Sequence, residues 1–308
     1  MEAQRSAIVP ARISPLPTSR GADRADGTLL AALGVLAFSF SFPATHAALA
    51  GFGPWSVTGV RGTLAAVIAL SALWFSGAPL PRRADWPGLA VVAAGCVIGF
   101  PLLTTLALQT SSTAHSAVVI GVLPMATATI GALRTRRHPS RAFWAAAATG
   151  AAAVIAFTVS QNHGRPTVAD LSLFGGLLTC AAGYAEGGRL SARLPGWQVI
   201  AWGVVLAAPV SLAVCALALP REPVHLSAEA VAGMAYLAGV SQFGGFVVWY
   251  RGMGLIGVAR ASQLQLAQPL LTLVWAVLLL GERMTAAVPV TAVVVLGCIV
   301  VTQRARAA

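Results

Sequence analysis

The chain has 308 residues, of which 57% are hydrophobic and only 9% are charged, and its formal net charge at pH 7 is +11. Soluble domains usually carry about a quarter charged residues, so this composition excludes an ordinary soluble domain and indicates a membrane protein. The sequence contains no lysine, which excludes a Walker-type phosphate loop and a lysine Schiff base, because each of these needs that side chain.

Residues 1–27 precede the first long apolar stretch. They are rich in Pro, Ser and Arg and lack the apolar run of a signal peptide. We expect a disordered cytoplasmic tail here, followed by a first span that acts as an uncleaved anchor. An Arg-rich transit peptide is the alternative, against which Glu2, Asp23 and Asp26 count.

Ten stretches are apolar and long enough to cross a bilayer. About 30 Å of hydrocarbon needs roughly 20 mostly apolar residues per helix. The sequence therefore predicts an all-α polytopic membrane protein with ten transmembrane helices. In chain order the predicted spans are 28–50, 54–77, 87–108, 113–133, 142–160, 171–190, 197–220, 230–252, 258–281 and 286–302.

The span pattern of residues 28–160 is repeated by residues 168–303. Each half holds five predicted spans, and because five is odd, the second half enters the membrane from the opposite side. This predicts two inverted five-helix repeats, in which matched helix interruptions mark a midplane binding site. The predicted break or gating positions are Pro43, Pro101 and Pro124 in the first half, with Gly187, Gly245 and Pro269 at the corresponding depths of the second.

The arginines predict how the chain lies in the membrane. With the N-terminus placed in the cytoplasm, sixteen arginines fall inside, and only Arg165, Arg221 and Arg283 fall outside, while Arg61 lies within a span. Cytoplasmic loops carry an excess of basic residues, so we expect a multi-pass protein of the inner membrane with both termini in the cytoplasm. The net charge then faces anionic lipid, and nucleic acid is not an expected partner.

Polar and aromatic residues inside the predicted spans are candidates for substrate contacts. Gln265 and Gln268 share a helix face next to Pro269. Interhelical hydrogen bonding is the alternative for each glutamine, and packing is the alternative for each aromatic side chain. The cavity candidates are Arg61, Tyr184, Gln242, Gln265, Gln268 and Trp275.

Charges within membrane helices are costly and indicate function by default. Arg61 either serves the cavity, or it snorkels outward or binds freed backbone carbonyls. Glu186, with Arg189 three residues on, is either half of a local ion pair or a proton-coupling carboxylate. His115, at the start of a span, either makes interfacial hydrogen bonds or titrates. Glu282 is expected to cap a helix or to pair with Arg61.

No cofactor, metal site or disulfide is expected. Cys96, Cys180, Cys215 and Cys298 each lie alone in a predicted span without C-x-x-C spacing, which is typical of small apolar packing residues. The sequence has neither a G-x-S-x-G nor an H-E-x-x-H motif. An enzyme is therefore not expected.

Three local stretches resemble the EamA type of the drug/metabolite transporter superfamily. Residues 107–124 are similar to that family's run from the third helix into a proline within the fourth. Gln268-Pro269 followed by residues 280–283, Leu-Gly-Glu-Arg, resembles the end of its ninth helix, and Arg61 lies where the family commonly has an arginine. The first half departs from the pattern, because residues 134–138 are basic where the family often repeats Gly-Glu.

The resemblance implies a secondary carrier that moves amino acids, other small metabolites or toxic compounds, often outward, by alternating access around a midplane cavity. The expected partners are a small-molecule substrate and the lipid bilayer, with a homodimer left open. A nucleotide-sugar-type carrier would need several cationic groups in its cavity, and only Arg61 qualifies. A non-transporting membrane sensor or assembly subunit remains the other alternative.

Overall fold

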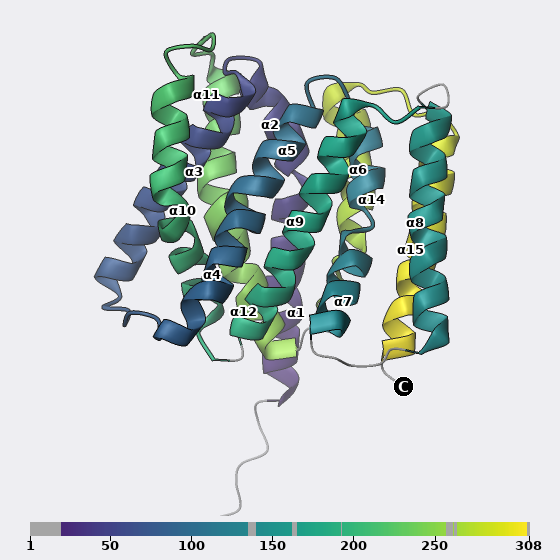
Figure 1. Cartoon of the computed structure of the whole chain (residues 1–308), viewed down its shortest axis with the longest axis horizontal. Helices are drawn as coiled ribbons and strands as arrows, with labels where there is room; N and C mark the ends of the chain where they lie inside the picture. Colours follow the sequence, from purple (N-terminus) through teal and green to yellow (C-terminus); the bar gives the residue numbers. More distant parts are fainter. Residues whose placement is uncertain are drawn as a thin grey trace, which may run out of the picture.

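The chain folds into a bundle of helices that run roughly alongside one another (Figure 1). The computed structural model describes residues 20–134, 140–161, 165–191, 193–256, 261 and 264–306. The helices are α1 (Arg20–Ser39), α2 (Ser41–Leu49), α3 (Pro54–Phe75), η1 (Arg83–Asp85), α4 (Trp86–Val92), η2 (Ala93–Gly99), α5 (Phe100–Ala107), α6 (Thr113–Ile120), α7 (Leu123–Arg134), α8 (Arg141–Gln161), α9 (Val168–Leu190), α10 (Gly196–Ala218), α11 (Ala228–Ala235), η3 (Tyr236–Gly244), α12 (Gly245–Ile256), α14 (Ala267–Leu280) and α15 (Ala287–Arg306).

Within these described residues, eight helical stretches are long and apolar enough to cross a membrane, where abutting segments are counted together. Two shorter apolar helices, Ala267–Leu280 and Ala287–Val301, correspond to the ninth and tenth predicted spans. The start of the ninth predicted span lies partly outside the described residues. The eight stretches are Ala25–Leu49, Pro54–Phe75, Arg83–Ala107, Thr113–Arg134, Arg141–Ser160, Val168–Leu190, Gly196–Ala218 and Ala228–Ile256. The chain is therefore an all-helical, multi-pass membrane protein.

The predicted tail over 1–27 falls mostly outside the described residues. The first described residue, Arg20, already belongs to α1, so the helix starts before residue 28, where the predicted span begins. The polar segment at 20–26 is rich in Ala and Arg, which are good helix formers. The helix therefore extends beyond its apolar part. The first turn of α1 and the end of α15 lie at the same end of the bundle (Figure 1); we refer to it as the α1 end.

Five helix interruptions occur within the described spans. Three are short breaks in the helix, at Phe40, at residues 121–122 and at residues 265–266. The other two are π-helical segments, η2 and η3. Proline cannot donate a backbone hydrogen bond and disturbs the preceding turn. Each of these interruptions is followed within a few residues by a predicted break residue, namely Pro43, Pro101, Pro124, Gly245 or Pro269.

The third and eighth spans are built in the same way. In the third, η2 gives way to α5, which carries Pro101 in its first turn. In the eighth, η3 gives way to α12 at Gly245. Pro101 and Gly245 are the two positions that the sequence repeat aligns. Short π-helical segments inside α-helices occur frequently at functional sites, so both segments direct attention to the space between them.

The predicted interruption at Gly187 is wrong. Helix α9 runs without a break from Val168 to Leu190. A Cβ atom added to Gly187 would overlap the hydroxyl group of Tyr250 on α12. Glycine at this position therefore makes room for a neighbouring side chain, and the helix does not bend there.

Close contact between α9 and η2 depends on small residues. A Cβ atom at Gly95 would overlap the backbone carbonyl of Thr179, and one at Gly183 would lie 2.5 Å from the Cys96 sulfur. Small residues of this kind let membrane helices approach closely. The approach brings Cys96 and residues of α9 to the same region of the bundle.

Gly95→Ala should lower the stability of the folded protein. Its added methyl group meets backbone, which cannot rotate away, and overpacking of this kind typically costs about 1–3 kcal/mol. Gly188→Ala is the matched control, because nothing lies within 4 Å of its added Cβ. Thermal unfolding in detergent should show a lower midpoint for Gly95→Ala only. Equal midpoints would contradict the packing described.

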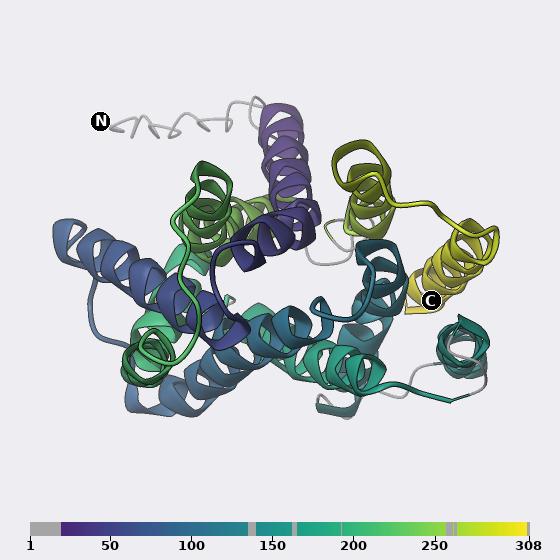
Figure 2. The ribbon, with the colours of Figure 1, turned by 90° about the horizontal axis from the view of Figure 1, so that it is seen from above.

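Helices α8 and α15 pack mainly on each other at one side of the bundle (Figure 2). The remaining helices form the larger body, in which α3 packs on α10 and α1 on α12. The interrupted helices all belong to this larger body. The site described next therefore lies away from the α8–α15 pair.

Candidate functional site

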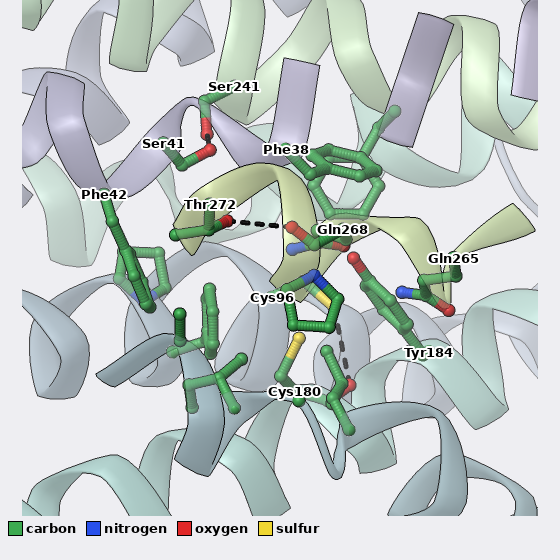
Figure 3. A pocket seen from close by; sticks show the side chains of 18 of the residues that line it. Phe38, Ser41, Phe42, Cys96, Cys180, Tyr184, Ser241, Gln265, Gln268 and Thr272 are labelled. Atoms are coloured by element: carbon green, nitrogen blue, oxygen red, sulfur yellow. Dashed lines mark hydrogen bonds between the residues drawn. The ribbon is translucent and has the colours of Figure 1, made fainter. Parts of the chain in front are cut away.

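A central cavity lies among the interrupted helices (Figure 3). Its volume is about 50 Å³. Its lining residues come from both halves of the chain: Phe38, Ser41, Phe42, Arg61, Cys96, Phe100, Pro101, Ala117, Ile120, Gly121, Leu123, Pro124, Cys180, Tyr184, Ser241, Gln242, Phe246, Gln265, Gln268, Pro269 and Thr272. Every one of the five helix interruptions contributes residues to this lining or is directly flanked by them.

The breaks in the fourth and ninth spans meet beside the cavity. Gly121, at the break between α6 and α7, is so close to Pro269 that an added Cβ would lie 3.5 Å from the Cβ of the proline. Pro124 and Gln265, beside the same two breaks, also line the cavity. Two broken helices that meet at one place leave backbone groups without helical partners, and such backbone is tolerated in membranes only inside protein or beside a water-filled space.

Aromatic rings form much of the wall. Phe38 and Phe246 are in edge-to-face contact with their ring centroids 4.8 Å apart, and Tyr184 meets Phe246 at 5.9 Å. Phe42 and Phe100 complete the set. Figure 3 shows Phe38, Tyr184 and Gln268 close together around the same space. A small apolar or aromatic solute would find favourable contacts here.

Arg61 brings a positive charge to this wall. It lies on α3 and is only 6% exposed. Its Nη2 atom donates to the Ser241 hydroxyl over 3.5 Å, and the Ser241 hydroxyl is 2.7 Å from that of Ser41. Its Nε atom has no hydrogen-bond partner. The guanidinium is therefore buried with most of its donor capacity unused.

The three predicted glutamines all line the cavity. Gln242 is 1% exposed; its Nε2 atom donates to the Cys96 carbonyl over 3.3 Å, while its Oε1 atom has no partner. Gln265 is 5% exposed, and its Nε2 atom has no partner. Buried polar groups are nearly always hydrogen-bonded. Unpaired amide atoms on a cavity wall are the groups that a ligand or bound water would satisfy.

Trp275 does not line the cavity. Its Nε1 atom donates to the Ser39 hydroxyl over 3.0 Å, and its ring meets Phe40 at 5.8 Å. Thr272, one turn earlier, donates to the Ser39 carbonyl over 2.9 Å. The structure therefore gives Trp275 a packing role between α14 and the first span, in place of the predicted substrate contact.

Two charged clusters lie outside the cavity, at opposite ends of α9. Near the α1 end, Glu186 accepts hydrogen bonds from Arg134 at 2.6 Å and from Arg189 at 2.7 Å. At the other end, His115 on α6 lies 2.7 Å from the Asp170 carboxylate. Each cluster joins the fourth span to the sixth. The lining residues of the cavity include neither Glu186 nor His115.

Glu282 caps a helix. Its carboxylate accepts hydrogen bonds from the backbone amides of Thr113 at 2.7 Å and Ala114 at 2.8 Å, the first two residues of α6. The alternative pairing with Arg61 is not formed, because that guanidinium contacts Ser241 instead. Both amides would otherwise lack helical partners, and a carboxylate also suits the positive end of the helix dipole.

Glu222 plays the same part for α3 and was not predicted. It accepts hydrogen bonds from the backbone amides of Trp55 and Ser56, at 3.2 Å and 2.7 Å. The carboxylate follows α10, whereas the helix it caps lies in the other half of the sequence. Local patterns such as a capping box cannot show a partner so far along the chain.

Glu282→Gln should reduce folded yield more than ligand affinity. The neutral amide has only one acceptor oxygen, so it cannot accept the hydrogen bonds of both backbone amides as the carboxylate does. Loss of a cap costs about 1 kcal/mol. Glu229→Gln is the matched control, because Glu229 is exposed on α11. Yield of monodisperse protein and thermal midpoint are the measurements. Full yield with lost binding would reverse the assignment.

Two cysteines belong to the cavity, although the sequence pattern indicated packing only. Cys96 on η2 and Cys180 on α9 both line it, and the Cys96 thiol donates to the Cys180 carbonyl over 3.9 Å (Figure 3). Both are reduced in the structure. In the part of the chain that is described, no three His, Cys, Asp or Glu side chains are grouped as metal ligands. No signal in a single sequence would have placed these two thiols together.

Comparison with known proteins assigns the family. A model of the EamA-like transporter family matches residues 26–159 and matches again at residues 167–303. The chain belongs to this family. The two matched ranges coincide closely with the two halves expected from the sequence, and together with the apolar helices they identify a multi-pass membrane protein of a transporter family.

The EamA chain is also similar to individual proteins. It is 39% identical over 272 residues to a Bacillus subtilis (strain 168) protein named uncharacterized transporter YdeK, a match that covers 88% of the chain and 95% of that relative. A protein of known crystal structure superimposes with a TM-score of 0.63 at 20% identity, over 90% of the chain and 97% of that structure. The latter similarity shows the fold alone.

Proposed function

We propose that this protein is a secondary transporter of the cytoplasmic membrane, with ten transmembrane helices in two inverted five-helix repeats and both termini in the cytoplasm. The double family match supports two repeats. The matched π-helical segments η2 and η3 support equivalent construction of the two halves. The excess of arginine on the side of the termini supports the orientation.

The observation that carries this proposal is the convergence of the interrupted helices on a buried cavity with unpaired polar atoms. In secondary transporters, discontinuous helices of both repeats form the substrate site near the bilayer midplane. A cavity of about 50 Å³ has room for only a few water molecules, since each needs about 10–15 Å³. A larger solute therefore enters only when the walls move.

Alternating access then requires the two ends of the bundle to open in turn. The Glu186 cluster holds the fourth and sixth spans together near the α1 end, and the His115–Asp170 pair holds them at the other end. Opening toward either side would separate one of these clusters while the other remains. The glycine and proline breaks beside the cavity supply the points at which the helices can bend.

We assign the direction as export of small metabolites, such as amino acids or related and toxic compounds. The resemblance of the sequence to EamA carriers supports this, and the relative's name, uncharacterized transporter, agrees with transport in general. Catalysis is not part of the proposal. A nucleotide-sugar substrate fits less well, because Arg61 is the single arginine among the cavity-lining residues of the described chain.

Growth of a host that expresses the protein, beside an empty-vector control, tests the proposal. The panel should contain toxic amino acids, their analogues, organic acids and lipophilic cations. Export predicts resistance to one chemical class together with a lower intracellular level of that compound. Confirmed membrane insertion with no difference for any compound would favour a sensor or assembly subunit instead.

A further inference from the structure

The positive charge of Arg61 has no counter-charge in the described part of the chain. Five carboxylates of the described chain are engaged elsewhere, and Asp26 and Glu229 are exposed, so that none of them neutralises the cavity. Asp85 pairs with Arg193, Asp170 with His115, Glu186 with Arg134 and Arg189, Glu222 with the start of α3, and Glu282 with the start of α6. None of the described acidic side chains completes Arg61, which leaves this place open to a group from outside the protein.

An anion suits this position for energetic reasons. A buried arginine without a partner is costly, and removal of the partner from a buried ion pair leaves that cost in place. Guanidinium binds carboxylates through two parallel N–H donors. Arg61 offers an unused Nε donor and an Nη2 donor whose hydrogen bond to Ser241 is long at 3.5 Å. Because the Nε atom is covered in this state, a carboxylate reaches these free donors only after the cavity walls move.

The remaining polar groups describe the rest of the ligand. The Oε1 atom of Gln242, next to Ser241 on η3, lacks a donor. Gln265 offers a free Nε2 donor. No acidic side chain is among the lining residues of the described chain, so an ammonium group would enter without a counter-charge. A neutral N–H or O–H group satisfies Gln242 without that cost.

We propose that the cargo is a small aromatic monocarboxylate carried as the anion. This rests on the proposed transport function and names its substrate class. The carboxylate binds Arg61, the apolar body lies against Phe38, Phe100 and Phe246, and a neutral donor on the body reaches Gln242. The carboxylate distinguishes this class from cations and neutral solutes. The absence of an ammonium group, which would find no acidic partner among the described lining residues, distinguishes it from the zwitterionic amino acids that the proposed function also admits.

A matched series of indole compounds tests the charge requirement. The four compounds share the indole ring system and its N–H donor but differ in charge. They are indole-3-propionate, its amide, tryptamine and tryptophan. Ligand-induced thermal stabilisation of the purified full-length protein in nanodiscs measures their binding. The carboxylate should bind at least tenfold more tightly than the other three. Equal binding of the amide or the amine, or no binding of any member, would overturn the proposal.

Substitutions assign the effect to Arg61. Arg61→Gln should weaken indole-3-propionate binding at least tenfold, whereas Arg61→Lys should retain part of it. Arg251→Gln, at an exposed position on α12, is the control and should bind as the wild type does. If Arg61→Gln does not fold, Gln242→Leu provides the second test, because it should weaken this ligand while Arg61 remains. Unchanged affinity in the variants that fold would refute the assignment.

Binding measured with and without chloride distinguishes an inorganic anion from the organic cargo as the ligand of Arg61. In chloride-free buffer the carboxylate should still bind to the wild type and not to Arg61→Gln. Stabilisation by chloride alone, with no effect of the carboxylate, would make Arg61 an inorganic-anion site and overturn the cargo assignment.

Saturable flux that is independent of the charge of the solute would refute this inference, but the proposed transport function would stand. Charge-selective binding without flux in proteoliposomes would instead refute the transport function, but the anion-binding site at Arg61 would stand.

Discussion

Modification of the cavity thiols with methyl methanethiosulfonate is expected to abolish transport. Cys96 and Cys180 both line a cavity of about 50 Å³, and an added methylthio group would occupy the space that the solute needs. Cys215 and Cys298 do not line it. Flux of the substrate found in the growth assay should therefore fall at least tenfold after treatment of the wild type.

Two double variants locate this effect. The Cys96→Ala, Cys180→Ala protein should keep its flux after treatment, because no thiol remains in the cavity. The Cys215→Ala, Cys298→Ala protein should stay as sensitive as the wild type. Excess substrate should slow inactivation of the wild type by occupying the same space. The opposite ranking of the two double variants would place the transport path elsewhere in the bundle.

Gln265→Met should reduce transport at least tenfold without loss of stability. The Nε2 atom of Gln265 is buried and unpaired in the free protein, so it costs folding free energy that a methionine of similar size does not. Its thermal midpoint should be equal to or higher than that of the wild type. A residue with only a structural role would show the reverse, a lower midpoint with flux retained in the folded fraction.

An exposed glutamine supplies the control for this substitution. Gln109 lies in the connection between α5 and α6 and is exposed, so Gln109→Met should alter neither the flux nor the thermal midpoint. Pro269→Ala probes the neighbouring break and should also slow transport, because proline holds the start of α14 apart from the residues before it. Normal flux in both Gln265→Met and Pro269→Ala would remove these residues from the site.

The membrane class and most break positions could be predicted because they depend on local physics. Apolar length gives the spans, and proline disturbs the helical turn before it, although Pro209 lies within the unbroken α10. Five of the six predicted break residues closely follow an interruption. Gly187 differs because glycine in a membrane helix either bends it or makes room for a neighbour, and only the position of Tyr250 decides between these.

The site was only partly predictable because most of its remaining members are ordinary apolar residues. Polar side chains are rare in spans, and this rarity made Arg61, Gln242, Gln265 and Gln268 recognisable. Phe38, Cys96 and Phe246 have no such signal, since phenylalanine and cysteine are common in helix packing. Trp275 shows the converse: a large aromatic residue near a break was expected in the cavity, but a hydroxyl on the first span binds its indole N–H group.

Helix capping between the two halves lay beyond prediction for a different reason. Glu222 and Glu282 each follow a membrane helix and cap another one far along the chain. Nothing in the residues near either glutamate identifies the receiving helix, because the contact depends on how the helices are arranged in space.

Flux measured in proteoliposomes shows whether this cavity carries a solute across the membrane. The substrate is the compound class found by the growth assay, and the three proteins compared are the wild type, Gln265→Met and Gln109→Met. We expect saturable flux for the wild type and Gln109→Met, and at least tenfold less for Gln265→Met at equal reconstitution. Absence of flux in the wild type, or equal flux in all three, would contradict a transporter that works through this cavity.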